Sequence, residues 1–306
     1  MRKISLLVSI LLLFLISTSK ATNISGNSGT AAFPFLKFSS GLKAQAMGEN
    51  FVAVGDGLST LYYNPAGVTN LQNIEVSAEY ILWLDILSKS NLSFVYPKTV
   101  IGPIGIGVDY FNVPYEKRDK EDDENFQSAS VWMGVFQISY ARAIKGKILV
   151  GASIKYITQN LDIQTANGIA VDIGGIYKLY DKTNIGLALQ NLGVELAEKN
   201  NDSLPFLLRI GQATKFFQEK LLFVSDINYG LTDGTASIGI GGEYKLIKYF
   251  YPRLGYKFIL NNNNLSAISG LNLGFGVNYK NINFDYVFSP KDDLGTIHRV
   301  AVAYSF

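Results

Sequence analysis

Apolar and polar residues alternate one by one over long stretches of the chain beyond residue 73. In the first stretch, one face carries Val76, Ala78, Tyr80, Leu82 and Leu84, and the other carries Glu75, Ser77, Glu79, Ile81 and Trp83. A repeat of two residues is typical of a β-strand, because successive side chains of a strand point to opposite faces. No later segment keeps the 3.6-residue repeat of a helix. The pattern therefore predicts an all-β fold.

The alternating segments are fourteen in number. They lie at about 74–84, 90–97, 104–111, 128–142, 148–159, 169–180, 184–192, 205–217, 221–229, 235–247, 251–260, 266–279, 282–289 and 296–306. Within the ninth, Ser225 interrupts the apolar face, and Leu222 and Val224 interrupt the polar one.

The connections between these segments alternate in length. Those at 98–103, 143–147, 181–183, 218–220, 248–250 and 280–281 are short, whereas those at 112–127, 193–204, 261–265 and 290–295 are mostly longer and acidic or rich in asparagine. Short turns at one end and long loops at the other are typical of outer-membrane barrels. We predict a transmembrane antiparallel up-and-down β-barrel of about 14 strands, with both chain ends on the short-turn side.

The last segment separates an apolar face from a polar one. His298, Val300, Val302, Tyr304 and Phe306 share the first, and Arg299, Ala301, Ala303 and Ser305 share the second. An outward apolar face that ends in aromatic residues is expected where a barrel meets lipid. The terminal Tyr304 and Phe306 resemble the signal by which the bacterial barrel-assembly machinery recognises its substrates.

The polar faces of the segments carry both signs of charge. The acids are Glu75, Glu79, Asp109, Asp172, Asp226, Glu243 and Asp285, and the bases are Lys155, Lys178, Arg209, Lys215, Lys245 and Arg299. Because unpaired charges are costly in a low-dielectric wall, we expect a wet lumen with internal ion pairs. A balanced lumen argues against a strongly ion-selective pore.

Composition supports a barrel over its competitors. The chain of 306 residues is 48% apolar and only 17% charged, yet no uninterrupted apolar run beyond residue 20 approaches the roughly 18 residues of a spanning helix. A sandwich, jelly roll or propeller also alternates, but no repeat of 40–50 residues supports a propeller. The lack of cysteine excludes disulfides, thiolate metal sites and a lipobox anchor. A single histidine excludes a multi-histidine metal site, and no cofactor is expected.

The first 21 residues have the pattern of a secretory signal peptide. Met1 to Lys3 is basic, residues 4–16 are leucine-rich, and Ser19 and Ala21 place small residues before the expected cleavage site. A short membrane anchor is the alternative. Cleavage after Ala21 changes the formal net charge from +2 to −1, so no basic excess remains to suggest nucleic acid as a partner. We expect export to the outer membrane of a Gram-negative (diderm) bacterium.

Residues 22–73 do not alternate, and are too few for a domain with a sizeable core of its own. We expect them to fold into the barrel, which predicts a signal peptide at 1–21, an N-terminal hatch at 22–73 and a barrel at 74–306. The hatch contains Met47-Gly48, Phe51-Val52-Ala53-Val54, Asp56 and Tyr62-Tyr63-Asn64-Pro65-Ala66-Gly67. This pattern resembles the N-terminal signature of the PorV/PorQ family of outer-membrane proteins, which is related to FadL-type long-chain fatty acid transporters. Glu49-Asn50 and Lys43-Ala44-Gln45 depart from it.

The resemblance implies two functions. Some members of the family are components of the type IX secretion system, with other components and cargo proteins as partners, and this is the function we expect first. FadL-type relatives instead move hydrophobic molecules such as long-chain fatty acids and hydrocarbons. Passage requires an apolar pocket, for which Phe33, Phe35, Phe38, Leu42 and Met47 are the candidates. Alternatively, these residues merely hold the hatch against Ile81 and Trp83.

Catalysis is a remote third possibility. His298 is the lone histidine, no partner serine or aspartate is evident beside it, and Gly-x-Ser-x-Gly and P-loop motifs are absent. We therefore expect no enzyme. The alternating Gly102, Gly105 and Gly107 are expected to mark tight barrel curvature and not a phosphate loop. The acidic run at 112–127 lacks the glycine turn and spacing of a calcium loop, so we expect a solvated loop.

Overall fold

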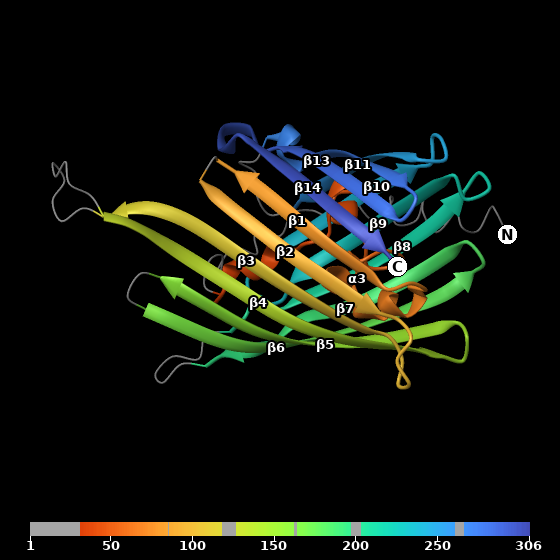
Figure 1. The fold of residues 1–306 in the computed structure, drawn as a ribbon, viewed down its shortest axis with the longest axis horizontal. Helices are drawn as coiled ribbons and strands as arrows, with labels where there is room; N and C mark the ends of the chain where they lie inside the picture. The colour runs from red at the N-terminus through yellow and green to blue at the C-terminus, as the bar shows by residue number, and fades with distance from the viewer. Residues whose placement is uncertain (1–30, 85, 118–126, 162–163, 197–202, 261–265) are drawn as a thin grey trace.

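The computed structural model describes residues 31–84, 86–117, 127–161, 164–196, 203–260 and 266–306. Fourteen antiparallel strands form one closed barrel in which each strand pairs with its sequence neighbours and β1 pairs with β14 (Figure 1). The strands are β1 Glu75–Trp83, β2 Leu87–Tyr96, β3 Ile104–Lys117, β4 Gln127–Ile144, β5 Ile148–Leu161, β6 Gln164–Tyr180, β7 Thr183–Glu195, β8 Leu207–Phe216, β9 Leu221–Gly230, β10 Ala236–Tyr244, β11 Phe250–Ile259, β12 Leu271–Tyr279, β13 Ile282–Pro290 and β14 Thr296–Ser305. The predicted number of strands and the up-and-down order are confirmed.

Three predicted boundaries are wrong, which are the end of β3, the start of β6 (Gln164 and not 169) and the start of β12. β3 runs to Lys117 and β4 starts at Gln127, with Glu116 opposite Ser128, because hairpin pairing needs only backbone groups and continues through charged residues. Figure 1 shows this hairpin projecting beyond the rest of the barrel at the long-loop end. The predicted twelfth strand starts too early, since the 3₁₀ helix η3 (Ala267–Gly270) occupies its first residues. The predicted signal peptide and residues 118–126 of the acidic loop lie outside the described residues.

The two faces of the wall differ as the alternation predicts. Outward-pointing residues include exposed Leu92, Ile154, Ile173, Leu254 and Val302. The inward face of β9 explains the irregular pattern of that strand. Leu222 and Val224 point inward and belong to the main apolar cluster inside the barrel, together with Phe51 and Tyr63.

Residues 33–71, which we call the plug segment, lie inside the barrel (Figure 1). They form the 3₁₀ helix η1 (Pro34–Lys37), the short helices α2 (Leu42–Ala46) and α3 (Thr60–Tyr63), and the 3₁₀ helix η2 (Pro65–Asn70). None of the helices in the described part of the chain is long and apolar enough to cross a membrane.

Inward glycines of the wall make room for the plug segment. A Cβ atom built on Gly186 would lie 2.1 Å from the carbonyl oxygen of Val52, and one on Gly255 would lie 2.0 Å from the amide nitrogen of Gly48. Gly105 likewise faces the Leu61 side chain, at 2.3 Å from an ideal Cβ. These glycines therefore let the backbone and side chains of the plug segment approach the wall. For Gly105, the sequence predicted tight barrel curvature and not this contact.

Candidate functional site

The Asn64-Pro65-Ala66-Gly67 turn fastens the plug segment to the wall at β5–β7. The Asn64 side chain donates hydrogen bonds to the carbonyl oxygens of Val52 (2.6 Å), Gly175 (3.1 Å) and Leu187 (3.3 Å). Its oxygen accepts from the Ala66 amide and caps η2, where Pro65 occupies the first turn. A Cβ atom on Gly151 would lie 2.5 Å from the Ala66 amide nitrogen. One amide side chain thus joins two parts of the plug segment to two wall strands.

The adjacent tyrosines, Tyr62 and Tyr63, lie inside the barrel between the plug segment and the wall. The Tyr62 hydroxyl bonds to Ser93 at 2.8 Å and accepts from Asn91 at 2.5 Å. Tyr63 is fully buried, packs edge-on against Phe51, and lies under the Arg209 guanidinium, 4.9 Å from its ring centre. Burial raises the pKa of both tyrosines well above the usual value. Both hydroxyls therefore stay protonated, and the pair is a packing and hydrogen-bonding centre of the plug segment.

Three inward carboxylates of the wall hold polar groups of the plug segment. Glu79 on β1 accepts from the amides of Gly41 (2.9 Å) and Leu42 (3.4 Å). Asp226 on β9 accepts from the amides of Phe51 (2.7 Å) and Val52 (3.0 Å). On β3, Asp109 accepts from the Ser40 hydroxyl at 2.5 Å. These carboxyl groups lie on β1, β3 and β9, so the plug segment is tied to separated parts of the barrel.

Ion pairs connect the plug segment to the opposite wall. Lys43 lies 2.7 Å from Asp56 and 3.2 Å from Glu243. Arg253 lies 2.6 Å from the same Glu243 and 2.5 Å from Asp285. Burial alone would lower the pKa of Lys43, but the carboxylates of Asp56 and Glu243 outweigh it and raise the pKa, so Lys43 remains charged.

Glu49, next to Gly48, forms a further ion pair with Lys257 at 2.6 Å. Burial alone would raise the pKa of Glu49, but the Lys257 ammonium outweighs burial and lowers that pKa to about 2. Asn50 is buried and bonds through its side-chain amide to the Met47 carbonyl at 2.7 Å. Glu49 and Asn50 thus each have a specific partner inside the barrel.

Sequence reasoning missed three inward cations of the wall, which are Lys89, Arg253 and the Lys257 that pairs with Glu49. Lys89 is 1% exposed, lies 3.3 Å from Asp109, and donates to the Phe38 carbonyl. It precedes the predicted start of its strand, and extending the alternation of Asn91 and Ser93 backwards would have found it. Arg253 lies two positions before the inward Gly255 of β11, so the same alternation predicts that Arg253 points inward. In contrast, Lys215 and Lys245, predicted to line the lumen, are exposed near the short-turn end.

The five residues predicted for an apolar pocket are spread over several packing groups in the described structure, where Phe35 and Phe38 border one cavity and Leu42 borders another. Leu42 packs with Ala46, Val287 and Ala301, and Met47 belongs to the main apolar cluster. The three phenylalanines are close together at η1. Phe33 is buried in a cluster with Val135, Ile157, Ala170 and Leu204.

An aromatic row extends from these phenylalanines to the wall. Phe33, Phe35, Phe111, Phe38 and Trp83 follow one another with ring centres 5.3–6.2 Å apart. Phe38 stacks on Trp83, so the expected contact between this segment and Trp83 is present. Phe35, Phe38 and Phe111 border a cavity of about 30 Å³, whose other walls include Lys155 and Gln137.

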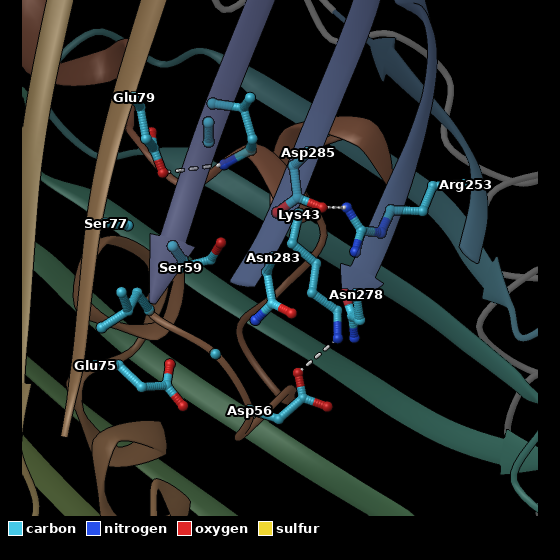
Figure 2. Close-up of a pocket in the computed structure, with 15 residues that line it drawn as sticks. Lys43, Asp56, Ser59, Glu75, Ser77, Glu79, Arg253, Asn278, Asn283 and Asp285 are labelled. Atoms are coloured by element: carbon cyan, nitrogen blue, oxygen red, sulfur yellow. Dashed lines mark hydrogen bonds and ion pairs between the residues drawn. The ribbon is translucent and has the colours of Figure 1, made fainter. Parts of the chain in front are cut away.

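A larger cavity of about 220 Å³ lies between the plug segment and the wall, and Figure 2 shows it to be lined mainly by polar side chains. Its lining comes from α2, from the turn at residues 56–59, and from inward residues of β1 and β11–β14. In the described part of the chain, no group of three or more histidine, cysteine or acidic residues is arranged to hold a metal ion.

The predicted catalytic and assembly candidates lie on the outward face. His298 is exposed, and its ring nitrogens lie 2.8 Å from the Tyr286 hydroxyl and 3.2 Å from the Thr296 hydroxyl. Neither partner is the serine or carboxylate that a hydrolytic histidine pairs with. Tyr304 and Phe306 are exposed and in edge-on contact, with ring centres 4.8 Å apart.

Solved barrels share this architecture. The chain resembles the toluene transporter TodX of Pseudomonas putida with a TM-score of 0.60 and 14% identity, over 87% of this chain and 98% of TodX. For the toluene transporter TbuX of Ralstonia pickettii, the TM-score is 0.55 and the identity 16%, over 90% of this chain and 98% of TbuX. A FadL homologue of Pseudomonas aeruginosa gives a TM-score of 0.58 at 9% identity, over 88% of this chain and 98% of that protein.

No protein-family model and no curated protein matches the sequence. What the chain shares with TodX, TbuX and the FadL homologue is therefore the fold, a closed fourteen-strand antiparallel barrel.

Proposed function

We propose that the chain is an outer-membrane channel through which small hydrophobic molecules pass down their concentration gradient. Two of the barrels that share its fold are described as toluene transporters. The exposed leucine, isoleucine and aromatic side chains on the outward faces of the strands favour a lipid environment, because such a surface is unfavourable in water. We propose that removal of residues 1–21 precedes insertion by the barrel-assembly machinery, that residues 22–73 act as the hatch, and that residues 74–306 form the barrel.

The aromatic row from Phe33 to Trp83 is the observation that carries this proposal. It provides a continuous aromatic surface inside the barrel, from the plug segment to the wall at β1 and β3. Aromatic rings pack favourably on apolar and aromatic solutes. The adjoining cavity of about 30 Å³ holds roughly one water molecule, so passage requires the half-buried Phe35 and Phe38 to move apart.

Uptake of toluene tests the proposal. The barrel is produced in a Gram-negative host that lacks its own hydrophobic channels, and entry of labelled toluene is compared with that in cells carrying an empty vector. We expect faster entry with the barrel and reduced entry for Phe35→Asp, because an ionised carboxylate interrupts the apolar surface. Phe217→Ala, at an exposed turn position, is the control and should transport normally. Entry no faster than in empty-vector cells, with a folded barrel present, would contradict the proposal.

A second candidate is the PorV/PorQ-type role in type IX secretion, which only the sequence signature at 41–68 favours. In this case the long loops would contact secretion components and cargo proteins. Deleting the gene in an organism that encodes the other type IX components would then leave cargo in the periplasm and not affect hydrophobic uptake. Normal secretion with impaired toluene uptake would favour the channel.

A hydrolase remains the third and remote candidate, and His298→Ala addresses it. We expect this variant to assemble and function like the parent. In the described structure, His298 contacts hydroxyl and aromatic groups on the outward face, which are those of Tyr286, Thr296 and Phe288. A hydrolase activity of the purified barrel that is lost in this variant would establish catalysis.

A further inference from the structure

The larger cavity, of about 220 Å³, contains more acidic than basic groups. Its lining includes four carboxylates and only two cations, which are Asp56, Glu75, Glu79 and Asp285 against Lys43 and Arg253. The volume is several times the roughly 30 Å³ that one water molecule occupies. The space therefore suffices for a small organic molecule.

Both cations of the cavity are already neutralised. Lys43 pairs with Asp56 and with Glu243, and Arg253 pairs with Glu243 and with Asp285. Glu79 is satisfied differently, because its oxygens accept the backbone amides of Gly41 and Leu42. Figure 2 shows the Lys43–Asp56 contact and the Asp285–Arg253 contact on one side of the cavity, and Glu75 on the other.

Glu75 has no such partner. Among the described residues, none makes a hydrogen bond or ion pair with its carboxylate, although the residue is only partly exposed. Ser77, two positions further along the inward face of β1, also lines the cavity and is 5% exposed, and its hydroxyl oxygen has no hydrogen-bond partner in the described structure. A partly buried carboxylate and a buried hydroxyl without partners are both unfavourable, and a ligand that pairs with them offsets this cost.

The remaining polar groups match a ligand that carries a hydroxyl or amine. The side-chain amides of Asn278 and Asn283 line the same space, and an amide offers both donors and an acceptor. The cavity is accessible near the short-turn end, because the Asp56 side chain on its rim is 49% exposed. A Mg²⁺ or Ca²⁺ ion is the poorer match, since it prefers six or more oxygen ligands in a compact cage.

We propose that this cavity binds a small organic ammonium ion, with the Glu75 carboxylate as its counter-ion and the Ser77 hydroxyl and asparagine amides as hydrogen-bonding partners. The site lies apart from the aromatic row and uses different residues. It therefore gives the barrel a polar, cation-selective site in addition to the apolar surface, and does not depend on the passage of hydrophobic molecules.

Calorimetric titration of the purified barrel in detergent tests this site. The probe is ethanolamine at neutral pH, which carries one ammonium and one hydroxyl, and glycolate is a probe of similar size and opposite charge. We expect saturable binding of ethanolamine and none of glycolate. Glu75→Gln should weaken ethanolamine binding by about tenfold or more, because it removes a charge-assisted contact. Ser77→Ala should weaken it by a smaller factor.

Asp181→Asn is the matched control, since Asp181 is an exposed carboxylate in the β6–β7 turn, outside the cavity. It should bind ethanolamine like the parent, and all variants should show the parent's heat-dependent gel mobility. Equal affinity of the parent and Glu75→Gln would overturn the proposal, as would binding of glycolate as tight as that of ethanolamine. Displacement of ethanolamine by equimolar Mg²⁺ would also overturn it, because that result indicates a metal site.

Discussion

At the residue scale, single polar side chains hold the plug segment in place. Asn64 bonds to carbonyl groups of the plug segment and of two wall strands. Asp226 and Glu79 each accept two plug amides. Leaving a buried polar group without a hydrogen-bond partner lowers the free energy of unfolding by more than the intact hydrogen bond contributes to it. The most sensitive positions should therefore be these few polar anchors.

We expect Asn64→Ala to destabilise the barrel by about 1–3 kcal/mol, because buried carbonyl groups lose their donor. Thermal or denaturant unfolding of the purified variant measures the effect. Asn73→Ala, at an exposed position, is the control and should leave the unfolding midpoint unchanged. An Asn64→Ala barrel as stable as the parent would contradict the anchoring role.

The Glu49–Lys257 pair predicts a loss of stability in acid. The pKa of Glu49 falls from 4.5 to about 2 beside the Lys257 ammonium. A carboxylate whose pKa is lower in the folded protein than in the unfolded chain stabilises the fold at any pH above the unfolded-chain pKa. This stabilisation is lost as the pH falls from the unfolded-chain pKa to the folded-state pKa. The stability difference between the parent and Glu49→Gln should therefore be constant above about pH 4.5 and shrink towards pH 2. A difference that does not change over this range would exclude the pair as its cause.

At the element scale, the strands were predictable and their inner contacts were not. Alternation is a local property, so each of the fourteen strands is visible in its own residues. The end of β3 was not visible, because backbone pairing continues past the apolar residues. Contacts between the plug segment and the wall join residues far apart in sequence, such as Asn64 and Leu187. No local sequence pattern encodes these contacts. The five pocket candidates could therefore be named from the sequence, but their positions inside the barrel could not be predicted.

The inward glycines make an element-scale prediction. Gly186→Ala should displace the plug segment from β7, because its Cβ would lie 2.1 Å from the Val52 carbonyl oxygen. We expect the closed barrel to persist but residues 33–71 to become sensitive to protease. Gly175→Ala on β6 is the matched control, since the nearest atom to its Cβ would be 3.8 Å away. Equal protease resistance of both variants would show that the wall adapts to the added carbon.

At the scale of the whole molecule, closure of the barrel through β1 and β14 leaves no unpaired strand edge. We expect the folded protein to migrate differently on an unboiled gel than after boiling, and to stay in membranes washed with carbonate. Extraction by carbonate, together with identical migration before and after boiling, would contradict the membrane barrel.

The two ends of the barrel predict its orientation. The β3–β4 hairpin projects at the end with long loops, whereas both chain ends are expected at the other end. A protease-cleavable tag inserted between residues 118 and 126 should be cut in intact cells. The same tag in the 143–147 turn should be cut only after the outer membrane is permeabilised. The reverse result would invert the orientation.

The enclosure of the plug segment also sets an order of events. The segment precedes β1 in the chain, and its backbone is surrounded by strands from β1 to β14 whose glycines fit its contour. Once β14 has paired with β1, the wall is a ring that no folded segment can enter from the side. Entry after this pairing is limited to the two ends of the barrel, so we expect residues 33–71 to be inside before β14 pairs with β1, although the strands that surround them are made later. In the assembly of this barrel, the plug segment therefore takes its place before the strand that follows it last in the chain, β14, closes the wall.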